Sequence, residues 1–347
     1  MMGRNPWRVS GTQPPLHGRV ALVTGANSGL GFEAALGLAH RGAKLILPIR
    51  NPDRGRSAVT RLLAACPEAD VTLLPLDLAC LHSVATCARA VADLTGRLDI
   101  QINNAGIMAP TRRMETQDGF ELQFGVNHLG HFALSAHLRP LLEAADGGGI
   151  LVSVASLAAA KNTLHFNDLQ SRHRYSPFGA YQQSKLANLL FAQELARRAG
   201  EQGWNLHARA AHPGWAATSI VANGQASTLP KPLGLIEQTL GTAVLRIMGQ
   251  SAAAGAEPLL YAALSPQARD GDYYGPHGPG ERRGPPGPAQ VHPTARQASA
   301  APRPVDISEP LTNTAWYAPR TSPCAAGPAR HSRRDTSSHH ASRLPVV

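Results

Sequence analysis

A tyrosine and a lysine one helical turn apart are the pair in this 347-residue chain whose types and spacing best fit chemistry. Tyr181 and Lys185 share one face of a predicted helix over 179–198. A phenol, with a pKa of about 10, exchanges protons near neutral pH only if its phenolate is stabilised, and a neighbouring ammonium does this. Ser156, just past a predicted strand at 150–154, can hold a carbonyl or alcohol oxygen beside the phenol. The pattern indicates proton transfer at such an oxygen, although the Tyr/Lys spacing also occurs on ordinary surface helices.

An apolar run that ends in three glycines predicts the element that brings a cofactor to these residues. Val20–Val23 is typical of a strand buried on both faces of a parallel sheet. Gly25, Gly29 and Gly31 then predict a tight turn that approaches a pyrophosphate and packs closely on the next helix. That helix, from about Leu30 to Arg41, points its amides and positive dipole end at the anion. An ordinary strand-to-helix turn is the alternative, because the spacing departs from Gly-x-Gly-x-x-Gly.

Predicted strands and helices alternate along most of the chain. Strands are expected at 43–49, 71–76, 98–102 and 150–154, and helices at 53–65, 81–95 and 119–142. This order predicts an α/β fold with a single Rossmann-type, doubly wound parallel sheet flanked by helices. A helix at 253–264 and a short strand at 273–274 complete the sheet edge. Ligands of such sheets bind at the carboxyl ends of the strands, which is where Asp77, Asn103–Gly106 and Ser156 stand.

The end of the second predicted strand bears on the choice of nicotinamide cofactor. In dinucleotide-binding folds an acidic residue there binds the ribose 2′-hydroxyl of NAD, whereas an arginine accommodates the 2′-phosphate of NADP. This chain has Arg50 and no acid between 44 and 52. NADP(H) is therefore favoured, while Asp53 is close enough to leave NAD(H) open.

Together these motifs resemble those of the classical short-chain dehydrogenases/reductases, over about residues 16–275. The branch most resembled is that of the retinol dehydrogenases and light-dependent protochlorophyllide reductases, which the long step from Ser156 to Tyr181 also matches. The resemblance is carried by Thr24–Gly31, Asn103–Gly106, Asn127, Ser156, Tyr181–Lys185 and His212–Thr218. Ala155 stands where the family commonly has a serine.

The resemblance implies hydride transfer between a nicotinamide and an alcohol or carbonyl, with four catalytic residues. Tyr181 resembles the general acid/base, and Lys185 the residue that lowers its pKa and binds the nicotinamide ribose. Ser156 is similar to the serine that holds the substrate oxygen. Asn127 is similar to the asparagine whose backbone holds a proton-relay water.

The resemblance also implies which residues bind the cofactor. Asp77 and Asn104–Gly106 match positions on the adenine side, and Pro213–Thr218 matches the loop at the carboxamide end. Leu233–Met248 would then lie in a lid, and its aliphatic stripe is either core contact or an apolar substrate wall. The full cofactor set is Gly25, Asn27, Ser28, Gly29, Leu30, Gly31, Arg50, Asp77, Leu78, Asn104, Ala105, Gly106, Tyr181, Lys185, Pro213, Gly214 and Thr218.

Composition excludes several other classes of protein. The sequence has no apolar run of eighteen residues and its start lacks the core of a signal peptide, so we expect no membrane span and a cytoplasmic location. Its four cysteines form no Cys-x-x-Cys pair, so the sequence indicates neither a disulfide framework nor a structural zinc site. His128 and His131 have no evident third ligand, so packing or a hydrogen-bonded site near the cofactor is favoured over a metal.

The C-terminal part differs in composition from the rest. We divide the chain into a lead at 1–17, a dehydrogenase domain at 18–275, and a proline- and arginine-rich tail at 276–347 that is expected to be disordered beyond about Pro285. The tail carries half of the net charge of +10. Its arginines are dispersed, so binding to nucleic acid is not favoured over a solvated tail.

The sequence thus predicts an NAD(P)(H)-dependent oxidoreductase acting on a small-molecule alcohol or carbonyl substrate that is expected to be apolar. A non-catalytic NADP-sensing regulator and a light-dependent pigment reductase are the alternatives. Most such regulators lose the tyrosine or the lysine, and this chain keeps both. The helices around Tyr181 and Phe120 form dimer faces in many family members, so a homodimer is an open option, although monomers also occur.

Overall fold

The computed structural model describes residues 15–161, 163–216, 250–291 and 304–316. Contacts divide the chain into a unit of residues 1–315 and a second unit of residues 316–347, of which only Trp316 is described. Thr218 and the predicted lid at 233–248 lie outside the described residues.

One eight-stranded sheet forms the centre of the first unit. Its strands follow the order β3-β2-β1-β4-β5-β6-β7-β8, and every neighbouring pair is parallel except β7 and β8. The predicted doubly wound sheet is confirmed, with an antiparallel strand added at one edge. The strands are β1 (Val20–Val23), β2 (Lys44–Ile49), β3 (Val71–Pro75), β4 (Ile100–Asn103), β5 (Gly149–Val154), β6 (Leu206–Ala211), β7 (Tyr273–Pro276) and β8 (Pro286–Pro288).

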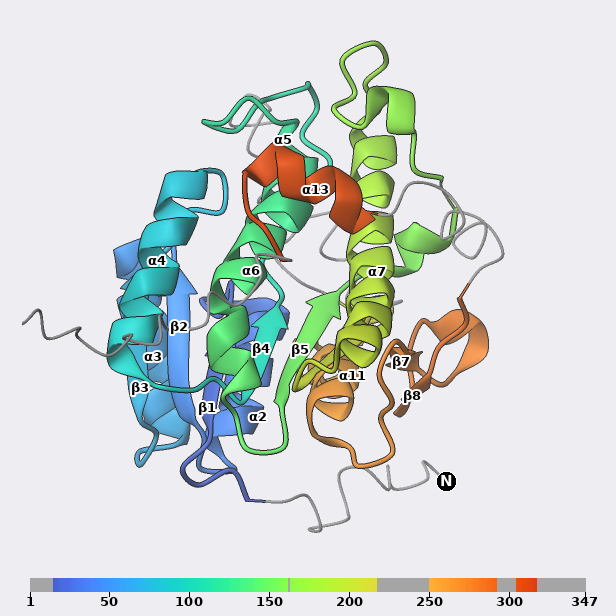
Figure 1. The fold of residues 1–347 in the computed structure, drawn as a ribbon. Helices are drawn as coiled ribbons and strands as arrows, with labels where there is room; N and C mark the ends of the chain where they lie inside the picture. Colours follow the sequence, from blue (N-terminus) through green and yellow to red (C-terminus); the bar gives the residue numbers. More distant parts are fainter. Residues whose placement is uncertain (1–14, 162, 217–249, 292–303, 317–347) are drawn as a thin grey trace, which may run out of the picture. The chain divides into compact units, whose positions relative to one another are not determined.

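Helices cover both faces of the sheet (Figure 1). One layer consists of α2 (Gly29–Ala39), α3 (Pro52–Ala65) and α11 (Ala252–Leu264), and the other of α4 (Leu81–Leu94), α6 (Gly130–Glu143) and α7 (Pro177–Gln202). The main apolar core lies between the first layer and the sheet, where Ala21, Leu45 and Leu259 are fully buried. Short helices are α5 (Leu122–Phe124), η1 (Gly125–Leu129), η2 (Leu157–Lys161), η3 (Phe166–Asp168), η4 (Pro279–Glu281) and α13 (Pro304–Thr312).

The helix predicted over 119–142 is interrupted. Glu121 caps the short α5 by accepting hydrogen bonds from the Gln123 and Phe124 amides, so the helix begins later than predicted. Residues 125–129 then form a π-helical turn before α6 begins. π-turns of this kind widen the helix locally and recur at functional sites. This one contains Asn127.

The strand β6 has no counterpart among the predicted strands. Its sequence, Leu-His-Ala-Arg-Ala-Ala, has no β-branched or aromatic residue, and its alternation of apolar and polar residues is short and relies mainly on alanine. The segment is a strand because it pairs with β5 along its whole length and with β7 at its end. Its conformation is therefore set by tertiary contacts rather than by local propensity.

Two pieces of the stretch expected to be disordered beyond about Pro285 are ordered. In β8, prolines flank Gly287 in an edge strand, where the missing proline amides cost no ladder hydrogen bond. The second piece, α13, lies across α7 and η1 (Figure 1), and buries Val305. Arg198 on α7 bonds Asp306. The compact unit therefore continues past the boundary expected at residue 275, whereas 292–303 and 317–347 lie outside the described residues.

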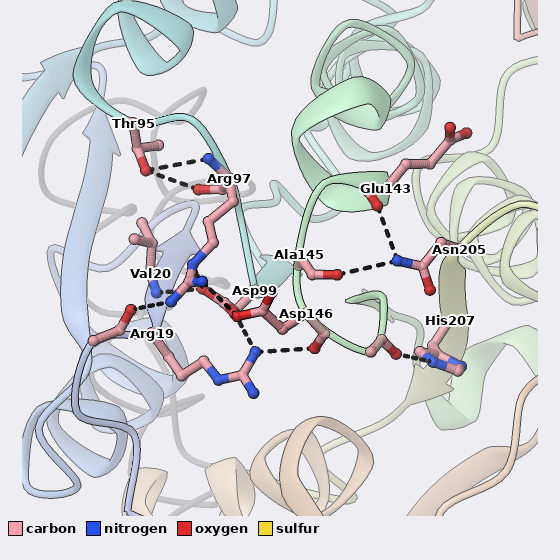
Figure 2. A network of polar contacts seen from close by, with 12 residues as sticks. Arg19, Val20, Thr95, Arg97, Asp99, Glu143, Ala145, Asp146, Asn205 and His207 are labelled. Atoms are coloured by element: carbon pink, nitrogen blue, oxygen red, sulfur yellow. Dashed lines mark hydrogen bonds and ion pairs between the residues drawn. The ribbon is translucent and has the colours of Figure 1, made fainter.

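A network of polar contacts ties the amino-terminal edge of the sheet together, opposite the strand ends that carry the predicted site (Figure 2). Asp99 is 4% exposed and accepts hydrogen bonds from the Arg19 guanidinium at 2.6 Å and from the Val20 amide at 2.8 Å. The Arg97 side chain lies 3.5 Å from Asp99 and bonds the exposed Asp146 at 2.6 Å. Asp99 thereby joins the start of β1 to the start of β4.

Asp99→Ala should lower the free energy of unfolding by about 2 kcal/mol, because the buried Val20 amide and the Arg19 guanidinium lose their shared acceptor. Asp146→Ala is the matched control, since Asp146 is 74% exposed and an exposed ion pair contributes only about 0.5 kcal/mol. Urea unfolding of both variants measures the difference. Equal losses of unfolding free energy in the two variants would show that the burial of Asp99 does not determine how much it stabilises the fold.

Candidate active site

A pocket of about 660 Å³ opens at the carboxyl ends of the strands. Its lining includes the turn after β1, the ends of β2 to β5, one face of α7 and the turn after β6. Every predicted cofactor residue that the structure describes lines it, and so does Ser156, whereas Asn127 does not. The nearby Ser153 is buried within β5 and is not part of the lining.

The glycine turn packs directly on the segment after β4. A Cβ atom at Gly25, where φ is +69°, would lie 2.8 Å from the Ala105 Cα atom. One at Gly31 would lie 2.4 Å from Asn104 Nδ2, which itself donates a 2.8 Å hydrogen bond to the Thr24 carbonyl. Only glycine allows this approach. The close contact expected of Gly31 is present, and it brings the start of α2 against Asn104 and the Gly25 carbonyl.

The phenol of Tyr181 faces the pocket beside Ser156. Tyr181 is 6% exposed, and its burial raises the pKa of the phenol, while a hydrogen bond with Ser156 lowers it in part. The net pKa is above the usual value, so the phenol carries its proton at neutral pH and can donate it to an oxygen in the pocket. Tyr273 on β7 donates a 3.1 Å hydrogen bond to the Ser156 carbonyl and so holds Ser156 in place.

Lys185 lies in the same wall but bonds the end of β5. It is 2% exposed, and its Nζ donates a 2.9 Å hydrogen bond to the Val154 carbonyl. Burial lowers the pKa of Lys185 to about 8. From the sequence, the ammonium was expected to lower the pKa of Tyr181, but burial raises that pKa and the opposing contribution comes from Ser156. The amine also lies close to Gly106, where a Cβ atom would be 3.6 Å from it.

Asn127 stands behind the pocket wall. Its side chain accepts from the Ile107 amide at 2.8 Å and donates to the Ile107 carbonyl at 3.0 Å. It also donates to Ser184 at 2.9 Å. Asn127 therefore fixes the residue that follows Gly106 and joins it to α7.

His131 connects Asn127 to the glycine turn. Thr24 Oγ1 accepts from the amides of Asn104 and Ala105, both at 3.0 Å, so its own proton is available for His131 Nε2, 2.8 Å away. His131 Nδ1 then carries a hydrogen and donates to the Asn127 carbonyl at 3.0 Å. Burial lowers the pKa of His131 to about 3, which keeps the ring neutral. His131 is thus held by hydrogen bonds beside the glycine turn, which is one of the two environments that the sequence suggested for these histidines.

His128 points into a different environment. Its ring packs among Phe124, Phe132 and Phe191, and bonds Ser308 of α13 at 2.9 Å. Burial lowers its pKa to about 4.

Among the described residues, no three His, Cys, Asp or Glu side chains are grouped so that they could hold a metal ion. Nor does any described helix have the length and apolar character needed to cross a membrane.

Two arginines line the pocket near the end of β2. One is Arg50, as predicted, and the other is Arg54, which the sequence reasoning missed. Asn51 caps α3 by accepting a 3.0 Å bond from the Arg54 amide, which sets Arg54 one turn from the strand end. Asn51-Pro52 is a helix-start signal, and the position of Arg54 three residues after Asn51 could have indicated that its side chain lies near the strand end. Asp53 bonds Arg56 instead and is not part of the lining.

Several apolar side chains in the lining also escaped the sequence reasoning. Phe178 is 50% exposed, stands one turn before Tyr181, and its ring centroid is 6.1 Å from that of the tyrosine. The i−3 spacing from Tyr181 could have indicated it. Others are Ile107, Met108 and Leu157, among further apolar residues of the lining.

Comparison with known proteins agrees with the family resemblance carried by the motifs. The family model described as short chain dehydrogenase matches residues 19–228. Retinol dehydrogenase 14 of Homo sapiens is 37% identical over 283 residues, which are 77% of this chain and 81% of that protein. Polyprenol dehydrogenase of Mus musculus is 38% identical over 257 residues, covering 73% and 74% of the two chains.

Solved structures give the same result. A crystal structure of an uncharacterised protein from Mycobacterium paratuberculosis is 36% identical, with a TM-score of 0.68, and the match covers 88% of this chain and 97% of that one. A short chain dehydrogenase from Escherichia coli CFT073, complexed with NADPH, is 27% identical with a TM-score of 0.50, over 67% and 93% of the chains. The resemblance inferred from the motifs is confirmed. The chain belongs to the short-chain dehydrogenase/reductase family of NAD(P)-dependent oxidoreductases, in its retinol dehydrogenase-like branch.

Proposed function

We propose that this protein transfers hydride between NADP(H) and an apolar alcohol or carbonyl compound, with Tyr181 as the general acid/base. The observation that carries the proposal is the shared pocket: Tyr181, Ser156 and Lys185 line the same cavity as the glycine turn. The residues present fit a dinucleotide, because the turn after β1 and the start of α2 present backbone amides at the strand ends. The nicotinamide ring, when bound, supplies or accepts the hydride.

The protein's own residues handle the proton. Ser156 holds the substrate oxygen within reach of the Tyr181 phenol, which donates its proton during reduction and accepts one during oxidation. The Lys185 amine, fixed by the Val154 carbonyl, lies in the same wall and stabilises the phenolate electrostatically. Asn127 acts from behind the wall by holding Ile107.

Preference for NADP(H) is supported by the charges near the end of β2. Arg50 and Arg54 both line the pocket, and two guanidinium groups are well suited to a 2′-phosphate. The nearby carboxylate of Asp53, which left NAD(H) open in the sequence, is engaged by Arg56 on the exposed face of α3. The E. coli relative with NADPH adds support from a solved structure.

An apolar substrate is supported by the side chains around Tyr181. Phe178, Leu157 and Met108 present apolar surface in the lining, and the half-exposed Phe178 ring is a contact area for a substrate. The names of two relatives, a retinol and a polyprenol dehydrogenase, refer to apolar alcohols. A panel of apolar alcohols and aldehydes with each cofactor, assayed in the dark and under illumination, tests the substrate class and separates this activity from light-dependent reduction.

Tyr181→Phe should lower kcat by about a thousandfold, because the ring remains but the exchangeable proton is lost. NADPH binding should change less than about twofold. Tyr261→Phe is the matched control, since its hydroxyl bonds Gln267 away from the pocket. Steady-state assays with NADPH and a responsive aldehyde measure both effects. Full activity in Tyr181→Phe would refute the proposed mechanism.

Arg50→Ala and Arg54→Ala should each weaken NADPH binding about tenfold and leave NADH binding nearly unchanged, because only NADPH offers the 2′-phosphate. Arg56→Ala, which removes a guanidinium that bonds Asp53 outside the pocket, should change neither. Fluorescence titration with both cofactors measures the ratio of the NADPH and NADH dissociation constants for each protein. The same ratio in all four proteins would exclude a phosphate-reading role for these arginines.

Lys185→Met should abolish most activity and yet stabilise the fold at pH 7. Burial lowers the lysine pKa from 10.5 to about 8, so keeping the amine charged in the folded state costs roughly 3 kcal/mol, at about 1.4 kcal/mol per pKa unit. Val154 O retains an amide donor, Asn188 Nδ2, at 3.2 Å. We expect an increase of about 1–3 kcal/mol in unfolding free energy.

The pH dependence follows from the same shift. Between pH 8 and 10.5 the folded wild-type protein releases the lysine proton while the unfolded chain retains it, so wild-type stability rises relative to the variant. The advantage of the methionine variant should therefore shrink between pH 7 and pH 10. Urea unfolding at the two pH values measures it, and a variant less stable at pH 7 would contradict the assignment.

A further inference from the structure

The turn between β7 and β8 packs against the turn after β6. The Trp215 amide donates a 2.8 Å hydrogen bond to the Arg282 carbonyl. A Cβ atom at Gly214, where φ is +63°, would lie 2.5 Å from the same carbonyl oxygen. The pocket-lining turn Pro213–Trp215 is therefore in contact with a segment that the sequence placed in the tail.

His212 links the two turns through its side chain. The ring is fully buried, and its Nδ1 accepts a 3.2 Å hydrogen bond from the Gly214 amide. The ring hydrogen therefore belongs to Nε2, which donates to Glu281 Oε2 at 3.2 Å. The ring also lies against Gly275, where a Cβ atom would come within 1.9 Å of Nε2. Glycine on β7 thus makes room for this histidine.

Glu281 is held in one orientation by its own contacts. Its Oε1 accepts a 2.8 Å hydrogen bond from the Gln290 amide, while Oε2 faces His212. The residue has a φ of +54°, in the left-handed region that disfavours a residue with a side chain, and the preceding Gly280 has +61°. A strained backbone of this kind persists where surrounding contacts fix it, and it is frequent near functional sites.

We propose that Glu281 is a positioning residue for the cofactor: it fixes His212 and, through His212, the Pro213–Trp215 turn that lines the pocket. Glu281 itself is not part of the pocket lining, so it acts only through the histidine. The inference rests on the proposed function, which places a nicotinamide dinucleotide in the pocket that this turn lines. Its consequence is that residues beyond 275 belong to the working unit of the enzyme.

NADPH titrations of the full-length chain test the proposal. Glu281→Ala should weaken NADPH binding about tenfold and raise its KM similarly, with kcat changed less than about threefold. Glu281→Gln should stay within about threefold of wild type, because the amide oxygen can still accept from His212. Glu201→Ala is the matched control, since this glutamate bonds Arg197 on the exposed end of α7.

Two further measurements separate positioning from general stability. Thermal unfolding without cofactor reports any loss of stability, and a lower Tm in Glu281→Ala with unchanged NADPH affinity would overturn the proposal. If Glu281 acts through His212, the double variant with His212→Gln should bind NADPH no more weakly than His212→Gln alone. Additive losses would overturn it.

The proposed function fails in a distinguishable way. If wild-type protein binds neither NADPH nor NADH, the cofactor assignment itself is wrong. If wild type binds NADPH and Glu281→Ala binds it equally well, only the role of Glu281 is wrong.

Discussion

The close approach of the turn after β1 to the segment after β4 is the contact on which the pocket depends. Gly25 and Gly31 permit it by lacking side chains, and Thr24 stabilises it by accepting the amides of Asn104 and Ala105. His131 extends it to Asn127, and Asn127 extends it to Ile107 and α7. Backbone amides, side chains and a neutral imidazole thus form one connected framework beneath the cofactor site.

Burial of ionisable groups gives this pocket its chemical character. A phenol and an amine are both nearly inaccessible to water, and burial disfavours the charged form of each. Burial therefore keeps the Tyr181 phenol neutral and makes a charged Lys185 unfavourable for stability. Shifted pKa values of this kind are frequent at active sites, and the proposed function uses both groups in proton transfer.

The C-terminal segment changes how the chain is divided. Composition suggested that the working domain ends near residue 275, yet β8 pairs with β7, and the turn between them contacts the pocket-lining turn after β6. Further on, α13 covers His128 and bonds α7 through Asp306. Proline and glycine content therefore marks an irregular segment without showing whether that segment packs on the core.

The sequence alone determined the elements whose signals are local. The glycine turn, the alternation of strands and helices, and the Tyr181/Lys185 spacing each follow from a few neighbouring residues, and together they predicted the sheet. Many of the pocket-lining residues were predicted from the family resemblance that these motifs carry. Tertiary structure decided what depends on distant partners. The strand β6 lacks β-branched residues and forms by pairing with β5 and β7. Glu281 meets His212 across 69 positions of sequence, and Asp53 bonds Arg56 rather than lining the pocket. The reason is physical: propensity and periodicity act over a few residues, whereas burial and hydrogen bonding are fixed only when the chain has folded.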